Sequence, residues 1–279
     1  VESVRDMHLL LARNLARAIS RYMIDAEAGF RMAVMHDGEP PHDATIALLD
    51  SLHFKHVCVI SADGVILSWI DVTGGPPGER LPEVMMARLA LVLAEAGKMP
   101  GEAAISDALA DAGGNPTIYL ALALANGDYA LGALSTAYLV ESQEAITFGR
   151  GGHAAVVDRQ GRIIGHPNPE WRDGMKDISA VKPVAAMTEG GSGVTVFYSP
   201  ATKSDMIAGY TVVPGIGWGA MVPQPMSELV GRAAEVRTAA IAIIVCGIVL
   251  VALISWWLAG YLARPIHAVV LAAQGGTGD

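Results

Sequence analysis

The chain has 279 residues, a formal net charge of −9 at pH 7 and a hydrophobic content of 52%. The negative charge argues against a nucleic-acid partner, whose phosphates would repel it. The length is enough for one large domain or for two modules of about 100 residues each. The two cysteines, Cys58 and Cys246, lie in separate apolar runs, and we expect no disulfide to support the fold.

Residues 1–35 have the periodicity of one long amphipathic helix. Four arginines recur on one side, and we interpret them as a solvated face. The apolar positions recur at close to helical spacing; they are Val4, Leu11, Leu15, Ala18, Ile19, Tyr22 and Met23.

Residues 36–139 contain the first set of predicted strands. Two β-rich runs within His56–Leu67 flank Asp63-Gly64, a pattern typical of a hairpin. A second hairpin is predicted around Asn126-Gly127 for the same reason. The other predicted elements are helices at 44–52 and 83–96 and a Gly/Pro-rich loop at 73–82.

The following residues, 140–225, repeat this scheme. Aligning His153–Val157 with His56–Ile60 brings Gly161 onto Gly64, so a second hairpin of the same kind is predicted. Consecutive strands joined by hairpins indicate antiparallel sheets in both modules. The other predicted elements are helices at 140–148 and 181–187 and strands at 193–198, 206–212 and 217–222.

An uncharged apolar run extends from Thr238 to Ala263, between Arg237 and Arg264. It is long enough to cross a hydrocarbon core of about 30 Å as a helix. Trp256 and Trp257, together with Tyr261, lie toward its second end, where aromatic rings favour the membrane interface. We therefore predict one transmembrane helix at 238–263, preceded by a juxtamembrane helix at 226–237.

This pattern resembles the double Cache family, the extracytoplasmic sensor domains of bacterial chemoreceptors, histidine kinases and cyclases. The resemblance is carried by the N-terminal helix, by the segments Val59–Val65 and Val156–Pro167, by Lys176–Ser179, and by Gly209-Tyr210 with Gly217–Gly219. Arg264-Pro-Ile266 resembles the start of a HAMP relay at 264–279.

The resemblance implies an α+β fold. A long N-terminal helix would accompany two PAS-like antiparallel-sheet modules, the membrane-distal 36–139 and the membrane-proximal 140–225. It also implies a homodimeric receptor in the bacterial inner membrane, with residues 1–237 in the periplasm and a cytoplasmic output domain beyond this chain. Neither a cofactor nor catalysis is predicted for these residues, which contain no HExxH, GxSxG or phosphate-loop motif.

In the family the ligand pocket lies in the membrane-distal module, between the sheet and the segment that crosses from Trp69 to Ala96. Arg80 could form a forked pair with a carboxylate, and Trp69 and Tyr119 could supply apolar walls. The candidate ligand-binding residues are Trp69, Asp71, Arg80, Ser106, Asp107, Tyr119 and Ser135.

The family's amino-acid receptors carry an Asp on the last strand of this module, which holds the ligand's amino group. This chain reads Gly132-Ala-Leu-Ser135-Thr there, and an ammonium group would lack a partner. We therefore expect the ligand to be a carboxylate or another small metabolite rather than an amino acid. Indirect input through a binding protein is an alternative.

The second module has its own candidate pocket residues, His166, Trp171, Arg172, Asp173 and Asp205. We expect Gly161, Gly165 and Gly209 to serve turns and close packing, and Trp218 to fill the core between sheet and helix.

Two other functions stay open at this point. A metal sensor would use His53 and His56 with His36-Asp37 and His42-Asp43, provided that these side chains converge. An interaction module would dimerise through the N-terminal helix and respond to a partner protein, without a small-molecule pocket.

Overall fold

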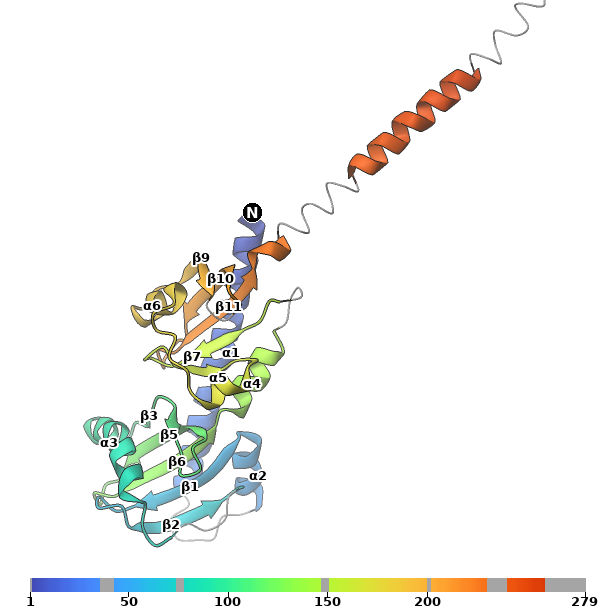
Figure 1. Ribbon diagram of the computed structural model, residues 1–279. Helices are drawn as coiled ribbons and strands as arrows, with labels where there is room; N and C mark the ends of the chain where they lie inside the picture. Colours follow the sequence, from blue (N-terminus) through green and yellow to red (C-terminus); the bar gives the residue numbers. More distant parts are fainter. Residues whose placement is uncertain are drawn as a thin grey trace, which may run out of the picture. The chain divides into compact units, whose positions relative to one another are not determined.

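The computed structural model describes residues 2–35, 43–73, 78–146, 151–199, 202–229 and 240–258. The chain divides into two compact units, Val1–Met226 and Ser227–Asp279. The first unit contains a long helix and two antiparallel sheets, as the sequence predicts (Figure 1).

Helix α1 (Glu2–Val34) contacts strands of both sheets in the first unit. Its predicted apolar face is buried, including Leu15, Ile19 and Met23, while the four arginines are exposed. Ala18 is the exception, because it is exposed on the opposite side. At about 1.5 Å per residue, α1 is long enough to support both modules as one continuous rod.

The first module follows α1. After α2 (Asp43–Ser51), its sheet has the order β2-β1-β6-β5-β3, with β4 also paired to β5. Its strands are β1 (Phe54–Ile60), β2 (Ile66–Asp71), β3 (Ala104–Ile105), β4 (Leu109–Ala110), β5 (Pro116–Ala123) and β6 (Tyr129–Ser135). Helix α3 (Glu83–Lys98) packs on the face opposite α1. The short strands β3 and β4 are absent from the sequence prediction, since two residues carry no alternation.

The second module repeats this topology with the order β8-β7-β11-β10-β9. Its strands are β7 (Ala155–Val157), β8 (Ile163–Gly165), β9 (Gly193–Ser199), β10 (Ser204–Val212) and β11 (Gly219–Pro225). Its helices are α4 (Ala137–Glu144), α5 (Pro169–Asp173) and α6 (Lys182–Thr188). Helix α4 begins three residues before the predicted start at residue 140, because the chain turns directly from β6 into the helix.

The predicted correspondence between the two hairpins is confirmed by their turns. The N–H groups of Gly64 and Gly161 donate to the carbonyl groups of Ser61 and Asp158. Both glycines have a positive φ, +86° and +79°, which a side chain would strain. In each module the next residue, Val65 or Arg162, forms a β-bridge fifteen residues further along the chain.

Three clusters of buried side chains form the core of the first unit. One lies between α1 and both sheets and includes Phe30, Phe54 and the fully buried Trp218. The second lies under α3, and the third lies under α6. Gly209 permits α1 to cross β10 closely, because a Cβ there would overlap the carbonyl group of His8. The predicted roles of Trp218 and Gly209 are therefore confirmed.

In the second unit, residues 240–258 form a helix long and apolar enough to cross a membrane. Arg237, Tyr261, Arg264 and the predicted HAMP segment lie outside the described residues, as do residues 230–237 of the predicted juxtamembrane helix.

Candidate functional site

A row of side chains crosses the α3 face of the first sheet. Strand pairing aligns Asp71 with His56, His56 with Ala133, and Ala133 with Tyr119. Residues directly opposite each other in a sheet point to the same face. Tyr119 and Ala133 pack under α3, so the whole row faces that helix. Of the predicted site residues, Asp71 and Tyr119 belong to this row.

A β-bulge in β1 adds Lys55 to the same side. Phe54 and Val57 both pack toward α1, although strict alternation would separate residues three apart. The register shift between Phe54 and His56 resolves this conflict, because it inserts Lys55 as an extra residue. Lys55 and His56 are then both directed away from α1.

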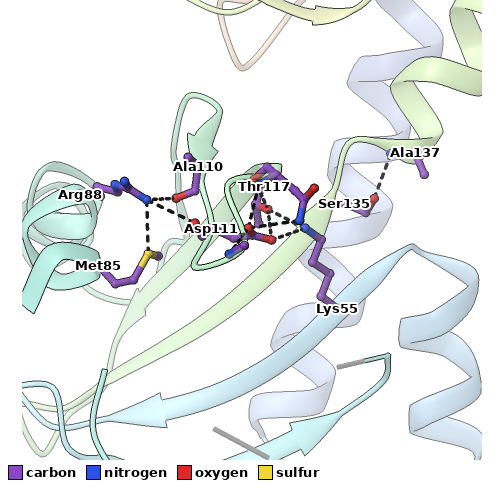
Figure 2. Close-up of polar contacts among 10 residues, drawn as sticks. Lys55, Met85, Arg88, Ala110, Asp111, Thr117, Ser135 and Ala137 are labelled. Atoms are coloured by element: carbon purple, nitrogen blue, oxygen red, sulfur yellow. Dashed lines mark hydrogen bonds and ion pairs between the residues drawn. The ribbon is translucent and has the colours of Figure 1, made fainter. Parts of the chain in front are cut away.

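Lys55 is the centre of a charged cluster (Figure 2). Its Nζ donates to Asp111 Oδ2 at 2.8 Å and to Thr117 Oγ1 at 2.7 Å. Thr117 lies opposite Ser135, so the predicted residue Ser135 is on the same face, where its Oγ accepts the N–H of Ala137. The ammonium group thus joins β1 to β5 and to the turn that precedes β5.

The carboxylate of Asp111 is held from two sides. Its Oδ1 accepts the N–H groups of Gly113 and Asn115, at 2.9 and 2.8 Å. Burial alone would raise the pKa of Asp111, but the hydrogen bonds from Lys55 and from the backbone outweigh it and lower the pKa. Asp111 is therefore a fixed anion at neutral pH.

Arg88 connects α3 to this cluster. Its Nη1 donates to the carbonyl oxygens of Ala110 and Asp111, at 2.6 and 3.3 Å (Figure 2). The turn that carries Asp111 is therefore tied both to the sheet and to the helix that covers it.

Trp69 lies beside the row, opposite Cys58, and stacks on His56 with 4.1 Å between ring centroids. Its Nε1 is buried and has no hydrogen-bond partner within the described part of the chain. Burial, together with the charge of Lys55, lowers the pKa of His56 to about 4. At neutral pH, His56 is an uncharged imidazole and Trp69 carries an unused donor.

Three predicted site residues have other partners. Arg80 pairs with Asp63 at the hairpin turn, at the far end of β1, and both side chains are more than half exposed. Ser106 is buried and accepts the N–H of Tyr119. Asp107 binds Arg159 of the second module. Arg80 and Asp107 do not join the row, because one is held at a turn and the other in a contact between modules, whereas Ser106 reaches the row only through the backbone N–H of Tyr119.

Sequence reasoning missed Lys55, Arg88, Asp111 and Thr117. The Asp-Ala-Gly-Gly-Asn run at 111–115 is a recognisable turn signal. Nothing in the sequence connects it to Lys55, which is 56 residues away.

The metal interpretation finds no support among the described residues. His53 lies near Tyr22 and Tyr138 on the α1 side, whereas His56 stacks on Trp69 on the α3 side. No group of three or more potential metal ligands occurs in the described ranges. His36, Asp37 and His42 lie outside those ranges.

Two further features lie away from the row. In the second module His166 stacks on Trp171, and Lys176 Nζ lies 3.9 Å from the centre of that ring. Arg172 pairs with Asp173, while Asp205 is exposed on β10. An open depression of about 580 Å³ lies at the β5–β6 turn, lined by Gly97, Pro100, Gly101, Leu122, Ala123, Leu124, Ala125, Gly127, Asp128 and Tyr129. Its lining is mostly small and apolar, so its chemistry is less specific than that of the row.

No protein-family model and no curated protein matches the sequence. Solved structures match over most of the chain. The extracellular domain of a protein named as a histidine kinase, rpHK1S-Z16, is 14% identical with a TM-score of 0.64, covering 81% of this chain and 95% of that one.

Two chemoreceptor domains are also similar. The ligand-binding domain of Pseudomonas aeruginosa PctB, in complex with L-Arg, is 18% identical with a TM-score of 0.58, covering 82% of this chain and 98% of its own. The ligand-binding domain of the chemoreceptor Tlp3 of Campylobacter jejuni, in complex with L-valine, is 13% identical with a TM-score of 0.55. The match covers 81% of this chain and 94% of that one. This chain has the double Cache fold.

The double Cache fold accounts for two sheets of corresponding strand order that share one long helix, the first sheet having β4 in addition. The three similar structures are extracellular or ligand-binding domains by name, and none is a catalytic domain. The row formed by Asp71, His56, Ala133 and Tyr119 lies in the first of the two modules that make up this fold.

Proposed function

We propose that this protein is the extracytoplasmic sensor of a transmembrane signalling receptor, and that a small molecule binds on the α3 face of the first sheet. The observation that carries this proposal is the set of polar groups in that place. Lys55, Asp111 and the unused Trp69 N–H lie on the side of the sheet that α3 covers. A purely structural interface there would be more stable if it were apolar.

The ligand that best fits is a carboxylate or another small metabolite without an amino group. PctB and Tlp3 bind L-Arg and L-valine in their crystal structures. In this chain the Asp111 carboxylate already holds Lys55, and the carboxylate of Asp71 is exposed at the end of the edge strand β2. Lys55, Arg88 and Trp69 are donors, and donors favour a ligand rich in oxygen acceptors.

A route from the site to the second module is built into residues 104–111. The segment ends at Asp111, in the proposed site. In its middle, Asp107 and the carbonyl oxygen of Ala108 accept hydrogen bonds from Arg159 and Arg162 of the β7–β8 turn. We propose that ligand binding shifts this segment, and that the second module passes the shift to the membrane helix. Residues 1–237 would then lie in the periplasm and the output domain in the cytoplasm.

The receptor is proposed to be a homodimer that pairs through α1. Large apolar side chains are exposed on this helix among polar ones, and burying them against a second copy would remove them from water; they are Met7, Leu10, Ile24 and Met32.

The proposal is tested by titrating the full chain, in lipid nanodiscs, with small carboxylates, amino acids, purines and divalent metals. Binding to the native state raises the thermal midpoint by mass action. We expect a shift with a carboxylate that is lost in Trp69→Phe, which keeps the ring stacking but removes the N–H donor. Trp171→Phe, in the second module, is the matched control. A cooperative melt with no shift for any compound would instead favour a protein partner as the input.

A further inference from the structure

We propose that Lys55 is a built-in ammonium group that fills the cation subsite of the ligand site, and so excludes ligands that carry an amino group. This inference rests on the proposed function, since it names the residue that sets the ligand class. It goes beyond that function because it assigns ligand specificity to Lys55, whose ion pair with Asp111 could otherwise be read as purely structural.

The geometry of Asp111 supports this role. Its Oδ1 is used by two backbone N–H groups, and its Oδ2 receives Lys55 Nζ at 2.8 Å. An incoming ammonium would need this second oxygen. Lys55 and Asp111 are mostly buried, with side-chain exposures of 24% and 20%, so the pair is not a solvated surface contact.

The competition favours Lys55 over a free amine. A tethered group has an effective concentration in the millimolar range or above, whereas a ligand must bind from dilute solution. Displacing Lys55 would also leave a half-buried ammonium without its carboxylate, which is costly. A ligand amino group therefore gains little from Asp111.

The remaining hydrogen-bonding capacity points to an acceptor. An ammonium group has three donors, and two of those on Lys55 go to Asp111 and Thr117. The third donor, on a side chain that is 24% exposed, is open to water or to a ligand, and Trp69 Nε1 has no partner within the described part of the chain. A carboxylate oxygen of a ligand could satisfy either donor. The same residue thus fills the cation subsite and offers a contact to an anion.

The test uses the full chain in nanodiscs, with butyrate and n-butylammonium as probes that match in length and differ in charge. We expect the wild type to bind butyrate and to ignore n-butylammonium. Lys55→Ala leaves Asp111 and Thr117 facing a space shaped for an ammonium group. Its thermal midpoint should fall and should recover with millimolar n-butylammonium, and its affinity for this amine should rise at least tenfold.

Lys55→Met is the matched control, because it fills the same space without a charge and should gain no amine binding. Lys55→Ser serves if the alanine variant does not fold, since its short polar side chain leaves the space beside Asp111 open and should still admit the amine. Wild-type protein that binds n-butylammonium or L-valine as tightly as the variants would overturn the inference. So would Lys55→Ala and Lys55→Ser that gain no amine binding.

The two proposals fail separately. Amine binding gained by Lys55→Ala, without any butyrate or other carboxylate response in the wild type, supports the cation subsite and contradicts the carboxylate ligand. A carboxylate response in the wild type without gained amine binding in either variant supports the sensor and makes Lys55 a structural partner only.

Discussion

Arg159 Nε lies 2.8 Å from Asp107 Oδ1, and this ion pair joins the two modules of the fold. Arg159 Nη2 also donates to the carbonyl oxygen of Ile105, and Arg162 Nη2 to that of Ala108. Three side-chain hydrogen bonds from the β7–β8 turn therefore hold residues 105–108 of the first module. The contact is formed by the segment that leads to Asp111, at the proposed ligand site.

Removing Arg159 should weaken the connection between modules. We expect Arg159→Met to lower the free energy of unfolding by about 1 kcal/mol, because the pair is partly exposed and the lost bonds to backbone carbonyls are modest. Hydrogen exchange should increase at residues 104–110, and exchange in β10 and β11 should stay unchanged. Equal protection at 104–110 in both proteins would show that the contact does not order this segment.

Arg162→Met should be more damaging than Arg159→Met. Arg162 binds Asp158, whose side chain is fully buried, at 2.7 Å. Burial raises the pKa of Asp158, and without the guanidinium the buried carboxylate would keep only the N–H groups of Gln160 and of residue 162 as donors. We expect a loss of about 3 kcal/mol in urea unfolding. Arg172→Met is the control, since its partner Asp173 is well exposed and the loss there should be under about 1 kcal/mol.

Gly209→Ala should separate α1 from the second sheet. Its Cβ would overlap the carbonyl group of His8 and the nitrogen of Leu9, which are backbone atoms and cannot rotate away. A loss of about 3 kcal/mol is expected from this overpacking, measured by thermal unfolding. Gly78→Ala is the matched control, because its nearest atom is 4.0 Å away and its φ is not positive. A Gly209→Ala protein as stable as this control would contradict the close packing of α1.

Stability should fall on acidification from pH 7 to pH 5. Burial lowers the pKa of His56 and of His166 to about 4, and it also lowers the pKa of His153. The unfolded chain takes up these protons near pH 6.5, whereas the folded chain does not. The contribution of these neutral histidines to stability is therefore fully present above about pH 6.5 and is lost progressively between about pH 6.5 and pH 4.

The lowered pKa values of His56 and His166 should each reduce the free energy of unfolding at pH 5 by about 1–2 kcal/mol relative to pH 7. His166→Phe should reduce the pH slope of the thermal midpoint in this window, and it should do so more than His53→Phe, at a partly exposed histidine. Carboxylates with a lowered pKa, such as Asp111, lose their contribution only below about pH 4, so they do not obscure the measurement. An unchanged slope in His166→Phe would assign the pH dependence elsewhere.

Leu10→Glu and Ile24→Glu should weaken self-association of the receptor. Both residues are more than half exposed on α1, at a spacing that suits pairing with a second copy. Sedimentation of the chain in detergent should show a shift from dimer to monomer without loss of the thermal midpoint. The control is Arg5→Glu, which is exposed on a different side of the same helix. A monomeric wild type would reject the dimer.

Several features of this protein were determined by the sequence alone, because each depends on neighbours along the chain. The apolar run around residues 240–258 predicts a membrane helix from composition and length. Gly64 and Gly161 mark two equivalent turns. Each turn needs a residue with a positive φ, and glycine adopts that φ without strain. The buried face of α1 follows from helical spacing.

The candidate site was decided only by the tertiary structure. Lys55 meets Asp111 because a bulge turns β1 and because an Asp-initiated turn lies beside Thr117 on β5. Asp107 and Arg80 have suitable chemistry for a ligand, yet the fold directs them to Arg159 and Asp63. Hydrophobic periodicity specifies which face of a strand is buried, but it does not specify which distant polar groups meet there. That choice depends on strand register and on the packing between modules, which are set by the whole chain.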